Sequence, residues 1–248
     1  MSDGADAMHV LPVRGLPEIE TGAPLGELIA ERAELRDGDV LVVSQKIVSK
    51  AEGQIRHLAS VSPGAEARRL AATLGKEPEL VELILEESRE VLRAERGVLI
   101  AETRHGFVCA NAGIDSSNLA EPGTVCLLPE DPDASARKLR SELRPTIGIV
   151  ISDSFGRAWR NGQSEVAIGC AGLMPLDDWR GRPDAAGREL SATVIAIADE
   201  MAAAADLVRG KDSRVPVALL RGLGRFVTPA DGPGATTLRR AAGDDLFR

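Results

Sequence analysis

Two segments of the sequence place an aspartate where an apolar run turns polar. Asp115 lies in GFVCANAGIDSSN, whereas Asp153 and Ser154 lie in TIGIVISDSFGRAWRNGQ. Because α/β proteins place their sites at the ends of strands, the polar groups of both segments are candidates for one site. Carboxylate and hydroxyl oxygens suit a hard divalent cation such as Mg²⁺ or Mn²⁺. The two segments therefore indicate a metal site.

Amide and cationic side chains accompany the two aspartates. Asn118 follows Asp115, while Arg157 and Arg160 follow Asp153. The guanidinium groups suit phosphate or carboxylate, because they form bidentate hydrogen bonds. However, Asp and Asn after strands commonly form turns in which the side chain caps its own backbone. The residues alone leave turn formation and the binding of a metal with an anion as equal alternatives.

A third polar segment, SQKIVSKAEG, follows the apolar run DVLVV and presents Lys46 and Lys50. Exposed lysines are most often only solvated, so these two carry little weight alone. The two Gly-Lys pairs of the chain lack the Walker A spacing, and neither a GxGxxG nor a GxSxG motif is present. A nucleotide would therefore need a cradle other than a P-loop or a Rossmann turn.

The composition excludes several classes of protein. The net charge of −8 and the aromatic content of 2% argue against a nucleic-acid surface, which needs positive charge and aromatic platforms. Three widely spaced cysteines fit neither a zinc knuckle nor a disulfide framework. The start, MSDGADAM, lacks the features of a secretory signal, and no apolar stretch approaches the roughly 20 residues that span a bilayer. We therefore expect a soluble cytoplasmic protein that binds neither nucleic acid nor membrane.

Strands and helices alternate along the chain and must position these residues. TIGIVIS, at 146–152, is a continuous apolar run that predicts a strand covered on both faces. The segment 184–208 is rich in Ala and predicts a central or dimer-buried helix. Residues 1–8 are expected to be a disordered tail. The other expected strands are 9–13, 39–44, 98–101, 106–110, 165–170 and 215–220, and the other expected helices are 25–34, 63–74, 78–92 and 133–144.

Four motifs, in this order and at similar intervals, resemble the coenzyme F420 γ-glutamyl ligases over nearly the whole chain. They are RGLPEI, GDVLVVSQKIVSKAEG, NAGIDSSN and ISDSFGRAWRNGQ. The resemblance implies one γ-glutamyl ligase domain over 9–248, with a mixed α/β (α+β) fold in two interleaved lobes with mixed sheets, neither P-loop nor Rossmann. It implies a homodimer that joins L-glutamate to the lactyl carboxylate of the coenzyme F420 precursor and then adds γ-linked glutamates. GTP and Mg²⁺ or Mn²⁺ would be used, and a requirement for K⁺ is left open.

The resemblance also assigns site residues by position. Because a carboxylate is a poor electrophile, GTP would first phosphorylate it, and the amine of glutamate would then displace phosphate. Lys50 and Arg157, the latter interchangeable with Arg160, are our candidates for the catalytic cations around the phosphates, on the basis of charge and placement. The implied GTP contacts are Leu16, Pro17, Glu18, Ile19, Gln45, Lys50 and Asn118, and the implied metal ligands are Asp115, Asp153 and Ser154.

Two positions depart from the pattern of the family. Gln45 stands where many relatives carry a small hydroxyl residue, and Lys211 falls where some archaeal relatives place a carboxylate or amide that helps to hold the metal. Lys211 is therefore not assigned as a ligand. Two alternatives to the ligase stay open: a metal-dependent phosphohydrolase that uses the same aspartates, and a non-catalytic nucleotide-binding protein whose polar loops are only turns.

Overall fold

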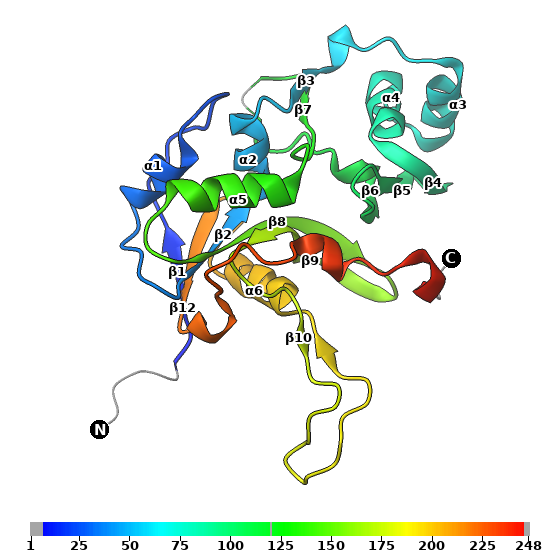
Figure 1. Cartoon of the computed structure of the whole chain (residues 1–248). Coiled ribbons are helices and arrows are strands. Elements are labelled where there is room, and N and C mark those ends of the chain that lie inside the picture. Colours follow the sequence, from blue (N-terminus) through cyan, green and yellow to red (C-terminus); the bar gives the residue numbers. More distant parts are fainter. Residues whose placement is uncertain (1–6, 120, 246–248) are drawn as a thin grey trace.

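The computed structural model describes residues 7–119 and 121–245. They form a mixed five-stranded sheet with helices on both faces, a smaller second lobe and a projecting arm (Figure 1). The mixed α/β class expected from the sequence is confirmed. Of the expected disordered tail, residues 1–6 lie outside the described residues, and Ala7 and Met8 belong to no helix or strand.

The central sheet has the strand order β1-β12-β2-β8-β9, and only the β2–β8 pair is parallel. β2 and β8 are apolar and buried on both faces, as the sequence predicts for residues 146–152. Their register places Ser44, the last residue of β2, opposite Ser152, so the residues that follow each of them lie at the same edge of the sheet. The strands are β1 (His9–Val13), β2 (Val40–Ser44), β8 (Gly148–Arg157), β9 (Arg160–Ala171) and β12 (Val217–Arg221).

Helices cover both faces of the sheet. On one face, Leu139 of α5 packs in a core with Leu41 and Ile149. On the other face, Met201 of α6 packs against Val150. The helices of the body are α1 (Leu25–Ala30), α2 (Gln45–Ala51), α5 (Pro132–Glu142) and α6 (Ile197–Asp206), and the 3-10 helices near its end are η3 (Gly224–Phe226), η4 (Ala235–Leu238) and η5 (Ala242–Asp244).

The second lobe is formed by the chain between α2 and α5, so the two lobes are interleaved in sequence (Figure 1). Its two helices pack over an antiparallel sheet of order β4-β5-β6 around a separate core. A short β3–β7 pair connects it to the body. Its elements are β3 (Ile55–His57), η1 (Leu58–Ser60), α3 (Ala65–Leu74), α4 (Pro78–Glu86), β4 (Ser88–Glu95), β5 (Val98–Thr103), β6 (Val108–Ala110), η2 (Asn111–Gly113) and β7 (Thr124–Cys126).

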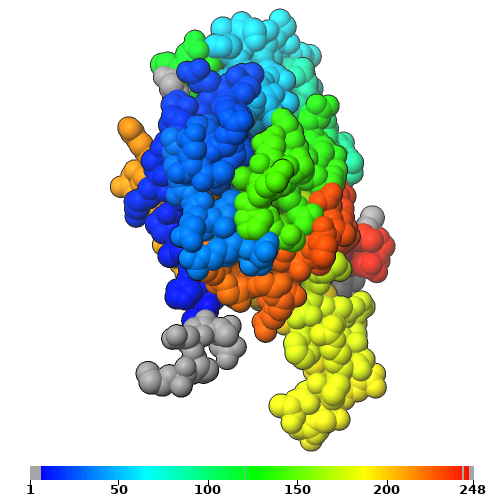
Figure 2. Space-filling view, turned by 60° about the vertical axis from the view of Figure 1, so that its left-hand side comes forward, coloured from blue at the N-terminus to red at the C-terminus, as the bar shows by residue number. Residues whose placement is uncertain are grey.

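A long arm leaves the body between β9 and α6. It consists of the short antiparallel strands β10 (Asp177–Asp178) and β11 (Val194–Ile195) with the loop between them. Figure 2 shows the arm, in yellow, projecting from the body. Among the described residues, no helix has the length and apolarity that crossing a membrane requires.

Three of the expected elements are wrong. The helix expected at 78–92 ends at Glu86, because a tight turn at Arg96-Gly97, both with positive φ, lets 88–95 pair with β5 as β4. The helix expected at 184–208 begins only at Ile197, since Gly and Pro residues hold the preceding segment in the arm. The polar loop expected after residue 152 is the far half of the β8–β9 hairpin.

Candidate functional site

A cavity of about 750 Å³ opens at the edge of the sheet where the β2–β8 pairing ends. It draws its walls from both lobes and from the segment that follows α6. Every position that the resemblance assigns to GTP or to metal lines this cavity. These residues are Leu16, Pro17, Glu18, Ile19, Gln45, Lys50, Asp115, Asn118, Asp153 and Ser154.

Helix α2 begins directly after β2 and points two lysines into the cavity. Lys46 and Lys50 are four residues apart and therefore share one face of the helix. Gln45 is buried, and its side-chain oxygen accepts a hydrogen bond of 2.9 Å from the Ser49 hydroxyl. The strand-to-helix junction thus fixes Gln45 within the wall and leaves the two ammonium groups facing the cavity.

Lys50 is held between two segments of the wall. Its ammonium donates to the Glu18 carboxylate and, at 3.2 Å, to the backbone carbonyl of Asn118. Asn118 has a φ of 54°, in the left-handed region that Asn tolerates better than most residues. Lys50 therefore joins the Leu16–Ile19 segment to the loop after Asp115.

Asp115 is both a turn former and the partner of a lysine. One carboxylate oxygen accepts the backbone N–H of Ser117 at 2.7 Å, and the other accepts the Lys46 ammonium at 2.6 Å. Burial acts to raise the pKa of Asp115, but the hydrogen bonds from Lys46 and Ser117 outweigh it and hold that pKa below its usual value. Asp115 is therefore ionised at neutral pH.

Asp153 has the opposite electrostatic character. Burial raises its pKa to about 7, and the negative charges of Glu165 and Asp115 add to this effect. The backbone N–H of Ser154 and, to a smaller extent, the charge of Lys46 oppose the shift, but none of the ion pairs among the described residues involves Asp153. A cation bound beside Asp153 would stabilise its ionised form, so this carboxyl group is poised to accept one.

Glu165 and Arg209 form a buried ion pair behind Ser154, and the sequence analysis missed both residues. Arg209 Nη2 lies 2.9 Å from a Glu165 carboxylate oxygen, and both side chains are at most 7% exposed. Glu165 stands opposite Ser154 in the β8–β9 register, and it accepts hydrogen bonds from the hydroxyls of Ser152 and Ser154. A prediction of the β8–β9 hairpin and its register would have revealed Glu165, because that register places it opposite Ser154.

The family model described as F420-0:Gamma-glutamyl ligase matches residues 15–222 of the chain. The chain belongs to this family. It is 43% identical to the coenzyme F420:L-glutamate ligase of Methanopyrus kandleri over 99% of each sequence, and 43% identical to that of Methanothermobacter thermautotrophicus over 97% of this chain and 99% of the relative. The enzyme of the same name from Archaeoglobus fulgidus is 45% identical over 87% of this chain and 88% of its own length.

The cavity offers oxygen donors of the kind that Mg²⁺ and Mn²⁺ prefer. Among the described residues, no three His, Cys, Asp or Glu side chains gather at the spacing of a metal site. A metal would therefore depend on Asp115 and Asp153, with the Ser154 hydroxyl and the oxygens of a ligand completing its coordination. The poised Asp153 carboxyl fits this role, so the residues are compatible with the metal that the family implies.

The two arginines predicted to lie around the phosphates are not among the residues that line the cavity. Arg157 and Arg160 pair with each other at the turn of the β8–β9 hairpin. The Arg157 guanidinium is exposed and donates to the backbone carbonyl of Asn161 at 2.7 Å. The hairpin carries Asp153 and Ser154 at its base and extends these arginines away from them.

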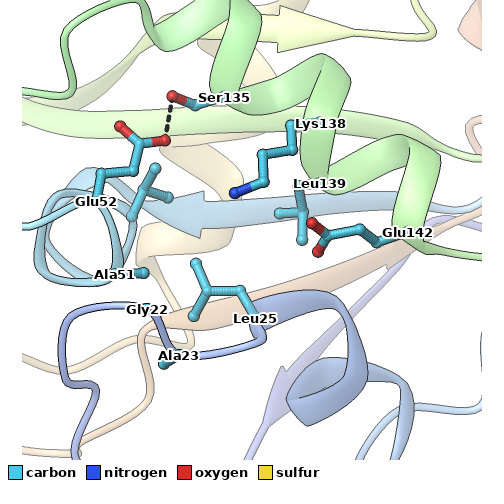
Figure 3. Close-up of a pocket in the computed structure, with 10 residues that line it drawn as sticks. Gly22, Ala23, Leu25, Ala51, Glu52, Ser135, Lys138, Leu139 and Glu142 are labelled. Carbon is cyan, nitrogen blue, oxygen red and sulfur yellow. Dashed lines mark hydrogen bonds between the residues drawn. The ribbon is translucent and has the colours of Figure 1, made fainter.

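A second, smaller cavity of about 70 Å³ lies between α1, α2 and α5 (Figure 3). Lys138 and Glu142 of α5 point into it, and Ser135 donates a hydrogen bond of 2.6 Å to Glu52. None of the residues that the family resemblance assigns to GTP or metal lines this space. It is too small for a nucleotide, so we assign it to the packing of the three helices.

Proposed function

We propose that this chain is a GTP-dependent ligase that forms an amide between L-glutamate and the lactyl carboxylate of the coenzyme F420 precursor, and then adds further γ-linked glutamates. Its membership of the F420-0:gamma-glutamyl ligase family supports this proposal. The observation that carries it is that Asp115, Asp153 and Lys50 all line the cavity at the edge of β2 and β8. The enzyme would act as a homodimer, as the resemblance implies, and in the cytoplasm, as the sequence composition predicts.

In this proposal, GTP lies along the Leu16–Ile19 segment, Gln45 and Asn118. Lys50 is close to two of these contacts, because its ammonium bonds Glu18 and the carbonyl of Asn118. When GTP binds, Lys50 exchanges one of these partners for a phosphate oxygen. Its positive charge then offsets the charge that develops on the phosphates during transfer.

Asp115 and Asp153 would hold Mg²⁺ or Mn²⁺, with Ser154 as a neutral oxygen ligand. When bound, the metal supplies positive charge that neutralises the phosphates and brings two anionic substrates together. Lys46 keeps Asp115 ionised and correctly oriented for this role, since it bonds one oxygen of the carboxylate. The exposed guanidinium of Arg157 contributes only if the hairpin turn moves toward the cavity.

The proposed reaction has two steps. First, a carboxylate oxygen of the precursor attacks the γ-phosphorus of GTP, the bond from that phosphorus to the β–γ bridging oxygen breaks, and GDP leaves. The product is an acyl phosphate. Second, the amine of glutamate attacks the acyl carbon and loses a proton to solvent, and phosphate departs with the electrons of the broken C–O bond. Lys50 would neutralise negative charge on the GDP that leaves in the first step.

The decisive experiment incubates the protein with GTP, Mg²⁺ or Mn²⁺, glutamate and the precursor, and measures product masses. We expect mass increments of successive glutamyl residues, with GDP and phosphate released only when both acceptor and amine are present. Asp115→Asn and Asp153→Asn should each abolish metal-dependent GTP binding. Equal release of phosphate with and without the precursor and glutamate would instead identify a phosphohydrolase, and binding of GTP without turnover would identify a non-catalytic protein.

A further inference from the structure

Three cationic side chains of the cavity wall lie beside its carboxylates and the Ser154 hydroxyl. Lys46 bonds Asp115, and Arg209 bonds Glu165. The third cation is Lys211, which lies in the segment after α6 and also lines the cavity. Its ammonium donates to the Ser154 hydroxyl at 2.7 Å and lies 3.7 Å from a Glu165 carboxylate oxygen.

Lys211 and Glu165 together use most of the bonding capacity of the Ser154 hydroxyl. A hydroxyl has one proton to donate and two lone pairs to accept with. Ser154 donates its proton to Glu165 and accepts the ammonium of Lys211 on one lone pair. One lone pair is left for another ligand, and any cation that approached Ser154 from the side of Lys211 would meet a positive charge first.

The charge balance behind Ser154 indicates what the ammonium does. Arg209 already neutralises Glu165 through a buried ion pair, so the charge of Lys211 is not needed to compensate that carboxylate. The Lys211 side chain is 71% exposed, yet its end is bonded at the cavity wall instead of lying in solvent. The ammonium is therefore held at the wall of the space that the substrates would occupy.

We infer that Lys211 is a built-in cation of this site, which takes the position of a second bound metal ion beside Ser154 and Glu165. Two-metal sites share oxygen ligands between neighbouring ions, and the ammonium, 2.7 Å from the Ser154 hydroxyl and 3.7 Å from a Glu165 oxygen, occupies the space in which a second ion would contact these two groups. The chain then binds one divalent ion, at Asp115 and Asp153. This inference rests on the metal centre of the proposed function and adds the number of divalent ions that each chain binds.

The inference can be tested by titrating the nucleotide-free protein with Mn²⁺ and measuring the free ion by electron paramagnetic resonance. The wild-type protein should bind one ion per chain. Lys211→Met removes the ammonium and should allow a second ion to bind, and Lys211→Glu should bind that ion roughly tenfold more tightly again, because it adds a carboxylate ligand. Lys76→Met is the matched control: Lys76 also follows a glycine but lies after α3, outside the cavity wall, and should leave the count at one.

Two results would overturn the inference: two ions bound by the wild-type protein, or one ion bound by both Lys211 variants. Thermal unfolding shows whether each variant is folded, and the exposed position of Lys211 favours this. Asp153→Asn separates the inference from the proposed function. If Asp153→Asn removes the ion that the wild-type protein binds, but the Lys211 variants bind no additional ion, only the role of Lys211 fails. If the wild-type protein binds no Mn²⁺ even with GDP, the metal centre of the proposed function fails as well.

Discussion

At the scale of single residues, Asp115 shows that forming a turn is compatible with a place in the cavity wall. Asp115 caps its own turn with one carboxylate oxygen and bonds Lys46 with the other. The turn therefore orients the carboxylate toward the cavity, and the two roles support each other. Asp153 gains no such partner from a turn, because it lies within β8. The two aspartates consequently differ in charge state, with the pKa of Asp115 lowered and that of Asp153 raised.

Asp153 should make the stability of the metal-free protein depend on pH. Its pKa is about 7 in the folded protein, against roughly 3.9 in an unfolded chain. Between these values the folded state holds a proton that the unfolded state has lost. The contribution of Asp153 to the free energy of unfolding is therefore full below about pH 4 and falls as the pH rises through about 7, by at most ~1.4 kcal/mol per pH unit.

Urea denaturation at several pH values in this interval measures the effect. Asp153→Asn should remove this part of the slope, since an amide does not titrate. Asp115→Asn is the comparison: the pKa of Asp115 itself is shifted downward, and its charge is a smaller cause of the raised Asp153 pKa than burial, so this variant should keep most of the slope. If wild type and Asp153→Asn lose stability equally between acid and neutral pH, burial does not raise the pKa of Asp153 as described.

Lys50 and Arg157 were predicted to act together, and their positions now separate them. The Lys50 ammonium is within the cavity wall, whereas the Arg157 guanidinium bonds the backbone of its own hairpin. Loss of a charge-assisted hydrogen bond to phosphate costs about 1.5–3 kcal/mol, so Lys50→Ala should raise the KM for GTP by roughly tenfold or more. Arg157→Ala should change it by less than about threefold. Steady-state kinetics decide, and the reverse order would show that the hairpin turn closes over the nucleotide.

At the scale of elements, the sequence predicted those strands that are buried on both faces. The apolar runs of β2 and β8 were predicted because both of their faces are buried, which gives short continuous apolar segments in the sequence. The far half of the β8–β9 hairpin was missed, since it extends past the sheet and carries polar residues on both sides. The strand β4 was missed for a related reason: it continues directly from α4, and only its pairing with β5 distinguishes it from more helix.

The packing of α5 on β9 depends on a glycine, which gives a test at this scale. A Cβ atom at Gly169 would overlap the carbonyl oxygen of Pro132, the first residue of α5. Because neither backbone can yield cheaply, Gly169→Ala should lower the free energy of unfolding by about 1–3 kcal/mol. Gly156→Ala, in the other strand of the same hairpin, is the control, since its Cβ would meet nothing within 4 Å. Chemical denaturation compares them, and equal stability of the two variants would contradict the close approach.

At the scale of the whole molecule, the site exists only when distant segments have folded together. The cavity wall is built from the Leu16–Ile19 segment, the start of α2, the loop after η2, the base of the β8–β9 hairpin and the segment after α6. Ten of the residues in this wall are those that the family resemblance assigns to GTP or to metal. The sequence could not predict that Lys46 bonds Asp115, or that Arg209 bonds Glu165, because these contacts join residues 44 or more positions apart.

The arm provides the last prediction, which concerns assembly. An isolated two-stranded ribbon is marginally stable in water unless something packs on it, and the arm's ion pairs, such as Arg182 with Asp177, are internal to it. Exposed Met174 and Val194 lie near its base. We therefore expect a second copy of the chain to cover the arm in the predicted homodimer.

Replacing residues 179–193 with a short turn should give a folded monomer by sedimentation velocity, with the body's melting temperature changed by only a few degrees. A shortened protein that remains dimeric would exclude the arm as the contact, and a monomeric wild type would show that the homodimer prediction is wrong.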